Sequence, residues 1–392
     1  MKGLEGESGR PRYRWAILFA SFYAFVAFAF AFQEIPPLIE PIMDEFTQIT
    51  HAEAGLLMSI VLVPGIFLGL PAGLFVERYR VRRVGFASLV CIALGCLVTA
   101  TANSFVMLLA GRLILGVGGT FVITATPAII AQWFSREELG KAMGIYGTNM
   151  PFATILAFPS ASIFRQAYGW RFPFYISLAV GITAAAVFVV VIKEGPFAEH
   201  KKRASMRQAV GNFEVWKVGL VWLFFNAAVL SFTTWAPELL ESYKGMHHVY
   251  AVFLPTLLMW AAVLCVPFYG WMSDRTGRRR PFAVVGSLLM TLAFVALAYT
   301  SNLALVASIL ALGITAAMVP PIASALPAEI LGPSLASVGF GITGICLNLG
   351  AASAQPLVGF LLDVTESYNL CLLGMAALST IGAIVAYTLK IH

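Results

Sequence analysis

The sequence contains few charged residues and lacks the patterns on which most enzymes depend. Only 11% of its 392 residues are Asp, Glu, Lys or Arg and 59% are apolar, whereas a soluble domain normally carries about 25% charged residues. It shows no nucleophile beside a base, no phosphate-binding glycine loop and no grouping of metal ligands. The five cysteines follow neither metal-ligand spacing nor a disulfide framework. We therefore expect no enzyme, no cofactor and no metal.

The sequence also leaves little room for a large soluble domain, because apolar runs fill most of it. A helix needs about 20 apolar residues to cross the hydrocarbon layer of a bilayer. The first run, Trp15 to Phe32, is longer than a signal-peptide core, and we expect it to be the first span. The predicted spans are residues 13–33, 54–76, 84–102, 105–133, 140–164, 172–192, 215–239, 250–272, 282–299, 303–326, 334–362 and 370–389. This pattern predicts an all-α membrane protein with twelve transmembrane helices in two pseudo-symmetric six-helix bundles.

The net charge of +6 comes from basic clusters between the apolar runs, which is typical of topology signals rather than of nucleic-acid binding. Counted over alternate loops, nearly all Lys and Arg fall on one side, and the other side has only Arg165, Arg171 and Lys244. Basic loops stay on the cytoplasmic side. We therefore expect a multi-pass protein of the cytoplasmic membrane with both termini in the cytoplasm, in contact with membrane lipids but not with nucleic acid.

The two halves of the sequence share a charged segment at equivalent places. The residues that match at an offset of 197 positions (73 to 270) are Gly73, Glu77, Arg78 and Arg83 in the first half and Gly270, Asp274, Arg275 and Arg280 in the second. Gly116 and Gly313 match at the same offset. Parallel repeats of this kind build one large class of transporters. The repeat predicts an N-terminal bundle over residues 1–192, a cytoplasmic connector over 193–214 and a C-terminal bundle over 215–392.

These two charged segments resemble the signature loop of the major facilitator superfamily of secondary transporters, a glycine followed by Asp-Arg and Gly-Arg-Arg. The first copy departs from the signature at Glu77, where aspartate is usual, and at Arg80, where a turn glycine is usual. The resemblance covers almost the whole chain and implies transport by alternating access. We expect the eight matched residues to form a latch between the halves on the cytoplasmic side. The alternative is that they only determine topology.

The fourth predicted span contains an arginine, Arg112, in a stretch that resembles the Arg-x-x-x-Gly-x-Gly pattern of the same superfamily. An arginine inside a span is costly and should face protein or a wet cavity. The repeat places Ile309 at the equivalent position, so the charge is not part of the internal symmetry. The resemblance implies a role in proton coupling or in holding an anionic group. The alternative is a structural arginine that caps backbone carbonyls.

Glu34 is the expected acidic partner of Arg112. It follows the aromatic end of the first span and precedes Pro36 and Pro37. If the helix continues past the prolines, Glu34 lies within the span and can titrate during transport; if the helix ends there, Glu34 is a loop carboxylate. The remaining candidates for solute contacts, each of which could instead bond a neighbouring helix, are Asn149, Asn226, Tyr146, Asn348 and Gln355.

The resemblance implies a carrier of a small-molecule solute, by symport or antiport, and the proton is the expected coupling ion. A small organic or inorganic anion is favoured by Arg112 and by the shortage of acidic groups deep in the spans. The alternative is export of lipophilic drugs through an aromatic, charge-poor cavity. The fifth span, around Gly144 to Pro151, lacks the Gly-Pro dipeptide of the family's antiporters, which weakens that alternative. A closed pair of six-helix halves is self-sufficient, so we expect a monomer.

Overall fold

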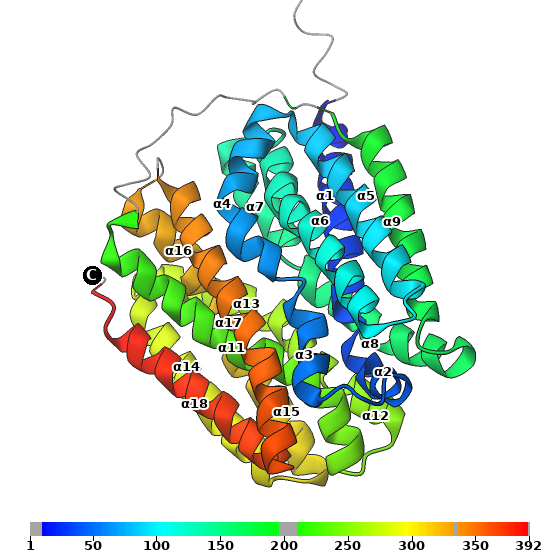
Figure 1. The fold of residues 1–392 in the computed structure, drawn as a ribbon. Helices are drawn as coiled ribbons and strands as arrows, with labels where there is room; N and C mark the ends of the chain where they lie inside the picture. Colours follow the sequence, from blue (N-terminus) through cyan, green and yellow to red (C-terminus); the bar gives the residue numbers. More distant parts are fainter. Residues whose placement is uncertain (1–9, 194, 196–209, 333–334, 391–392) are drawn as a thin grey trace, which may run out of the picture.

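The computed structural model describes residues 10–193, 195, 210–332 and 335–390. All regular secondary structure in this part of the chain is helical. In Figure 1 the N-terminal bundle (blue to green) lies at the upper right, and the C-terminal bundle (green through yellow to red) lies at the lower left. The N-terminal bundle consists of α1 (Arg10–Gln33), η1 (Pro36–Leu38), α2 (Ile39–Glu45), α3 (His51–Ser59), α4 (Val63–Arg78), α5 (Val81–Ala100), α6 (Phe105–Ala131), α7 (Arg136–Tyr146), α8 (Asn149–Tyr168) and α9 (Phe172–Val191).

The C-terminal bundle follows a connector that lies mostly outside the described residues. It consists of α11 (Phe213–Glu238), η2 (Leu239–Tyr243), α12 (His248–Phe253), α13 (Thr256–Thr276), α14 (Arg279–Tyr299), α15 (Asn302–Ala316), α16 (Pro320–Leu331), α17 (Ala336–Thr365) and α18 (Tyr368–Tyr387). The predicted boundaries at 192 and 215 fall close to the end of α9 and the start of α11, and they stay predictions.

Ten helical segments of the described chain are long and apolar enough to cross a membrane. The other two predicted spans, 140–164 and 303–326, are each interrupted. Span 140–164 is divided between α7 and α8 at Gly147–Thr148. Span 303–326 is divided between α15, which ends at Ala316, and α16, which starts at Pro320. A proline has no backbone N–H to donate and therefore starts a helix more readily than it continues one. Together the segments make the predicted all-α fold of twelve transmembrane helices in two six-helix bundles.

The two bundles repeat the same internal packing. Helix α6 packs on α5 and α4, as α15 packs on α14 and α13; α9 packs on α5, as α18 packs on α14. A Cβ at Gly116 would lie 2.3 Å from the carbonyl oxygen of Val61, and a Cβ at Gly313 would lie 2.9 Å from the Cα of Leu258. Val61 and Leu258 are also 197 positions apart, so the two equivalent glycines pack against the backbones of two equivalent residues. Only glycine permits so close an approach, so the packing confirms the sequence repeat.

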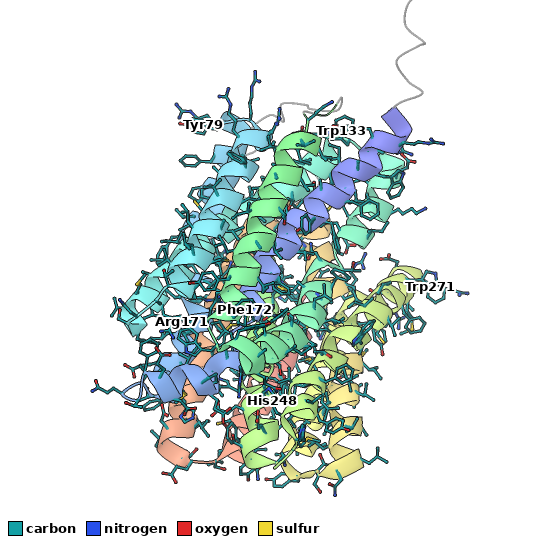
Figure 2. All side chains as sticks on the ribbon, turned by 90° about the vertical axis from the view of Figure 1, so that its right-hand side faces the viewer. Tyr79, Trp133, Arg171, Phe172, His248 and Trp271 are labelled. Carbon is teal, nitrogen blue, oxygen red and sulfur yellow. The ribbon has the colours of Figure 1, made fainter. Side chains whose placement is uncertain are left out.

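Each bundle has one basic end and one opposite end. At the basic end, Arg82 donates to the carbonyl of Val189 (2.6 Å) and Lys217 to that of Thr388 (3.0 Å). At the opposite end, Arg171 forms a bidentate pair with Glu45, which holds the pKa of this arginine above its ordinary value. Figure 2 shows Tyr79 and Trp133 near the basic end, with Arg171 and His248 toward the other end. The predicted topology makes the basic end cytoplasmic.

Two seams join the bundles. Helices α3 and α4 pack on α17, and α8 packs on α12 and α13. At the offset of 197, α3 and α4 correspond to α12 and α13, and α8 corresponds to α17. The two seams are therefore equivalent, and the two bundles are related by approximate two-fold symmetry. At the first seam a Cβ at Gly55 would lie 2.8 Å from the Cα of Pro356. The helices therefore touch there with no side chain between them.

The segment between α4 and α5 contains a backbone conformation that glycine would adopt more readily. Arg80 has φ 54° and ψ 120°, and its counterpart Gly277 has φ 63°. An L-residue at positive φ costs about 1–2 kcal/mol because its Cβ crowds the backbone. This strain explains physically why a turn glycine suits this position in the second copy.

We predict that Arg80→Gly is more stable than Arg80→Ala by about 1 kcal/mol. Both variants remove the same side chain, so their difference isolates the backbone conformation. Thermal unfolding of the two purified variants in one detergent measures it. Equal melting temperatures would contradict the prediction.

Candidate functional site

The centre of the N-terminal bundle contains a buried arginine. Arg112 lies on α6 and is 1% exposed. Its Nε donates to the carbonyl of Leu57 (2.9 Å), Nη1 to that of Ala31 (2.6 Å) and Nη2 to that of Phe32 (2.9 Å). The guanidinium thus joins α6 to the end of α1 and to α3. In this conformation Arg112 caps backbone carbonyls, as the structural alternative expects, and its role in proton coupling or in holding an anionic group stays a prediction.

The carbonyls that Arg112 binds are free because two helices are broken beside it. In an unbroken helix the Phe32 carbonyl would accept from residue 36, but Pro36 has no N–H. Helix α1 accordingly ends at Gln33, and η1 starts at Pro36. Leu57 lies within the last turn of α3, just before the break that separates α3 from α4. Unsatisfied carbonyls are costly in a dry interior, so the arginine satisfies groups that the two breaks release.

Glu34 lies at the first of these breaks, inside the first membrane span (residues 12–45). Its side chain is 1% exposed, so it is not a loop carboxylate. Oε2 accepts a hydrogen bond from Ser177 on α9 (2.6 Å), whereas Oε1 has no partner among the described residues. A buried charged carboxylate needs compensating partners. Glu34 therefore has one strong partner, one unpaired oxygen and a cation on the neighbouring helix.

Two candidates lie near the ends of α7 and α8. Tyr146 is 6% exposed, and its hydroxyl shares a hydrogen bond with Thr126 of α6 (2.6 Å). Asn149, 4% exposed, begins α8. Gln33 was not among the predicted candidates, yet its side chain donates to Thr154 of α8 (2.9 Å), and its Oε1 has no partner among the described residues. These polar groups belong to the same bundle as Arg112.

The other candidates lie on the C-terminal bundle. The Asn226 and Asn348 side chains each donate to a carbonyl of their own helix, at 2.8 and 2.9 Å. Gln355 of α17 is fully buried at the first seam; its Oε1 accepts from Ser59 of α3 (3.2 Å), and its Nε2 has no partner among the described residues. The structure therefore separates the predicted site residues into a group in the N-terminal bundle, which includes Arg112 and Glu34, and a group on α11 and α17 of the C-terminal bundle.

Among the described side chains, no contact joins the predicted latch residues across the bundles in this conformation. A Cβ at Gly73 would meet nothing within 4 Å, and one at Gly270 would meet Pro321 of its own bundle at 3.6 Å. Among the described residues, neither glycine provides a close contact with the other bundle in this conformation. Asp274 pairs with Arg279 in its own bundle (2.8 Å).

The arginines of the latch lie against nearby aromatic rings, with which they make cation–π contacts. Arg78, Arg275 and Arg280 lie over Tyr79, Trp271 and Tyr387, at 5.5, 5.4 and 4.6 Å. The backbone N–H of Arg83 closes the turn at Arg80 (2.9 Å). The side chain of Glu77 lies outside the described part. The latch role stays a prediction.

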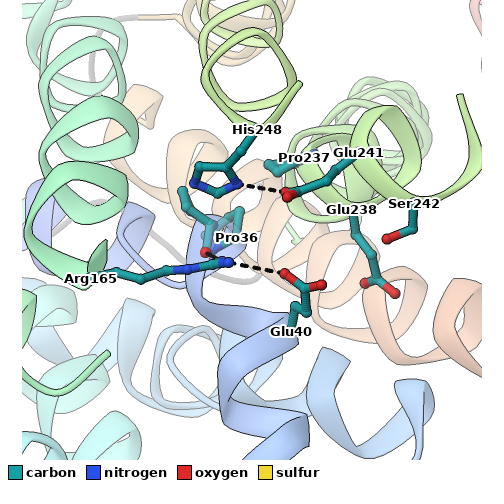
Figure 3. A pocket seen from close by; sticks show the side chains of 9 residues that line it. Pro36, Glu40, Arg165, Pro237, Glu238, Glu241, Ser242 and His248 are labelled. Atoms are coloured by element: carbon teal, nitrogen blue, oxygen red, sulfur yellow. Dashed lines mark hydrogen bonds and ion pairs between the residues drawn. The ribbon is translucent and has the colours of Figure 1, made fainter. Parts of the chain in front are cut away.

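Two histidines begin helices at the seams. His51 starts α3 and His248 starts α12, and each contacts a helix of the other bundle. Figure 3 shows the small hollow beside His248, with the pairs His248–Glu241 and Arg165–Glu40. The offset of 197 between the histidines was the signal that could have identified them.

Comparisons with known proteins give the family. The model of the Major Facilitator Superfamily matches residues 15–260 and again 245–391. The chain is 23% identical over 368 residues to the inner membrane transport protein RhmT of Escherichia coli, covering 85% of this chain and 84% of that protein. It is 26% identical over 287 residues to the probable nitrate/nitrite antiporter NarK1 of Thermus thermophilus, covering 70% and 64%. It is 23% identical over 386 residues to the probable sulfoacetate transporter SauU of Cupriavidus necator, covering 88% and 87%.

A solved structure shares the fold. A bacterial homologue of the human lysosomal transporter Spinster, in an inward-facing and occupied conformation, matches with a TM-score of 0.83 at 16% identity, covering 96% of this chain and 97% of that one. The family match spans nearly the whole chain, and these relatives are transporters. The chain therefore belongs to the Major Facilitator Superfamily and is a multi-pass membrane transporter, not an enzyme.

Proposed function

We propose that this transporter moves a small organic or inorganic anion across the cytoplasmic membrane by proton-coupled alternating access, with Glu34 as the proton carrier. The observation that carries the proposal is the burial of Glu34 two residues after the Phe32 carbonyl that Arg112 binds, with one carboxylate oxygen that has no partner among the described residues. A carboxyl group that is dry in one conformation and wet in another exchanges its proton as the protein cycles.

The charge of the centre links the proton to an anion. Arg112 donates its hydrogen bonds to neutral carbonyls, and Glu34 is the buried carboxylate in the described part of the chain, so Glu34 is the group that can balance the charge of Arg112. When Glu34 binds a proton, the centre gains a net charge of +1, which acts strongly in a low-dielectric interior. Proton binding then favours an anion nearby, and by reciprocity the anion favours the proton. The nitrate/nitrite and sulfoacetate transporters among the relatives support the anion class.

The contacts between the bundles support a state that is closed at the opposite end. There, Asp363 of α17 accepts hydrogen bonds from the backbone of α3 (3.0 and 2.9 Å). At the basic end, the ion pairs Arg14–Glu138 and Arg279–Glu329 each join residues of one bundle. With the predicted topology, we infer an inward-open conformation.

Export of lipophilic compounds is the second candidate. It is favoured by the stacked rings of Trp222 and Phe225, 5.1 Å apart on α11, and by 26% identity over 45% of the chain to multidrug resistance protein 2 of Bacillus subtilis.

A ligand panel separates the two candidates. We predict that nitrate or sulfoacetate raises the melting temperature of the purified protein saturably, because a ligand of the folded state stabilises it by about 2.7 kcal/mol at a hundredfold excess over its Kd. Chloride at equal ionic strength is the control for salt. Stabilisation by lipophilic cations alone would reject the anion and favour export.

Substitution of the carboxyl group tests the coupling. We predict that Glu34→Gln abolishes proton-driven accumulation of the solute in liposomes but retains solute exchange, because the amide fills the same space without binding a proton. Ser177→Ala, which removes the hydrogen bond and keeps the carboxyl group, should retain accumulation. If Glu34→Gln still accumulates solute against a gradient, Glu34 is not the proton carrier.

Substitution of the arginine tests its hydrogen bonds. We predict that Arg112→Lys lowers the free energy of unfolding by about 2 kcal/mol or more, because one ammonium group cannot reach carbonyls on both broken helices. Thermal unfolding in detergent measures the loss, and Arg78→Lys at the exposed basic end is the matched control. Equal stability of the two variants would show that the carbonyls find other partners.

A further inference from the structure

The opposite end of the first seam is held by a histidine between two carboxylates of the other bundle. Nδ1 of His51 lies 2.6 Å from Oδ1 of Asp363 on α17, and Nε2 lies 3.0 Å from Oε1 of Glu238 on α11. The ring also packs beside Trp235, at 5.9 Å between centroids. Asp363 additionally caps the N-terminus of α3 from the other bundle. We call His51, Glu238 and Asp363 the clasp.

The clasp fixes the protonation state of the ring. An ionised carboxylate only accepts hydrogen bonds, and a neutral imidazole donates from one nitrogen only. Both contacts of His51 can form together only when the ring carries two protons. A neutral His51 would leave one carboxylate facing a lone pair. The geometry therefore makes the number of bonds across the seam depend on one proton.

We propose that His51 is a second proton site, distinct from Glu34, whose protonation closes the opposite end of the transport pathway by clasping the N-terminal bundle to Glu238 and Asp363.

The clasp adjoins an open hollow of about 310 Å³ through which water can reach His51. The side chain of His51 is 29% exposed, and those of Glu238 and Asp363 are 12% and 22% exposed. The site can thus exchange protons with the medium on that side. The charged and titratable groups that line the hollow or lie one turn away on α3 are Glu238, Asp363, Glu366, Tyr368 and Glu53.

The symmetry-related histidine has different chemistry and supplies an internal control. Nδ1 of His248 lies 2.6 Å from Glu241 of its own bundle, and Nε2 lies 2.7 Å from the hydroxyl of Ser162 on α8. A hydroxyl donates or accepts, so this contact forms with a neutral or a charged ring. Glu238 of the clasp also lines the small hollow beside His248, together with Arg165 and Glu40, which form an ion pair. Closure at the second seam should therefore not require a proton on His248.

The test measures how far the opposite end opens as a function of pH. Spin labels at Thr47 and Ser301, one in each bundle, are introduced into the full chain with its five cysteines replaced, and the distances between labels are measured in nanodiscs. In the parent the short-distance population should fall as pH rises, by about tenfold relative to the open population, as expected for the loss of a charged hydrogen bond. In His51→Gln it should be low and insensitive to pH.

Glu238→Gln separates the clasp from a general loss of packing. The introduced amide can donate to a neutral ring nitrogen, so this variant should stay closed as pH rises. It also keeps the test decisive if His51→Gln fails to fold. His248→Gln should retain the pH dependence of the parent. Glu53→Gln, which removes the nearby charge and leaves an amide oxygen that can still accept in the capping box of α3 with Thr50, should also retain it.

Three outcomes would overturn the proposal. One is an unchanged pH dependence in His51→Gln. Another is a Glu238→Gln variant that opens with rising pH like the parent. The third is loss of the pH dependence in Glu34→Gln with His51 intact, which would place the sensed proton at Glu34. Because distances are read without solute, this result is independent of whether an anion is transported.

Discussion

The hydrogen bonds from Arg112 to the backbone carbonyls of Ala31, Phe32 and Leu57 are the interaction on which the centre of the molecule depends. Two broken helices in one bundle expose carbonyls that lipid cannot satisfy. A guanidinium has five donors in a rigid fork, and it satisfies both breaks from one position. The same breaks create the space in which Glu34 is buried. The helix breaks therefore explain why Arg112 and Glu34 are both buried in the bundle. In the proposed function, the same two residues couple the proton to the solute.

The broken segments are also those that touch the other bundle. The 3-10 turn η1 follows Glu34 and packs on α11, and α3, whose Leu57 carbonyl binds Arg112, packs on α17. Under the proposed function, a change of charge at Glu34 would act on elements that form the seam. His51 begins α3 and is bound by α11 and α17. The two proposed proton sites therefore both adjoin α3. His51 is its first residue, and the Leu57 carbonyl near its end is bound by Arg112 of the Arg112–Glu34 centre.

Much of the architecture followed from the sequence, because it depends on patterns that repeat. Apolar runs, basic loops and the offset between Gly116 and Gly313 were sufficient for the two bundles and their matched packing. They could not reveal that Arg112 binds carbonyls, because this requires knowing that Pro36 and the gap between α3 and α4 lie on either side of it. Contacts such as Ser59 with Gln355, or His51 with Asp363, join residues about 300 positions apart, and no local pattern predicts such a pairing.

The resemblance to the family led to two kinds of expectation. The structure shows where the charged loops and Glu34 lie, but it does not test the latch. The charged loops lie at equivalent places in both bundles, but in this conformation Asp274 bonds within its own bundle. A latch that forms only in one state of a cycle is invisible in another state. Glu34 was an open question in the sequence, since Pro36 and Pro37 could either end the first span or interrupt it. The chain continues through the buried turn η1 into α2, within one segment that is long and apolar enough to span a membrane, and Glu34 itself is buried.

The central claim is that anion binding and proton binding at the Arg112–Glu34 centre assist each other. The most direct test adds nitrate or sulfoacetate to purified protein in weakly buffered detergent solution with a pH indicator. The account predicts saturable proton uptake by the parent protein, and none by Glu34→Gln at a concentration where that variant still binds the anion. Anion binding by the parent without proton uptake, or equal uptake by both proteins, would contradict it.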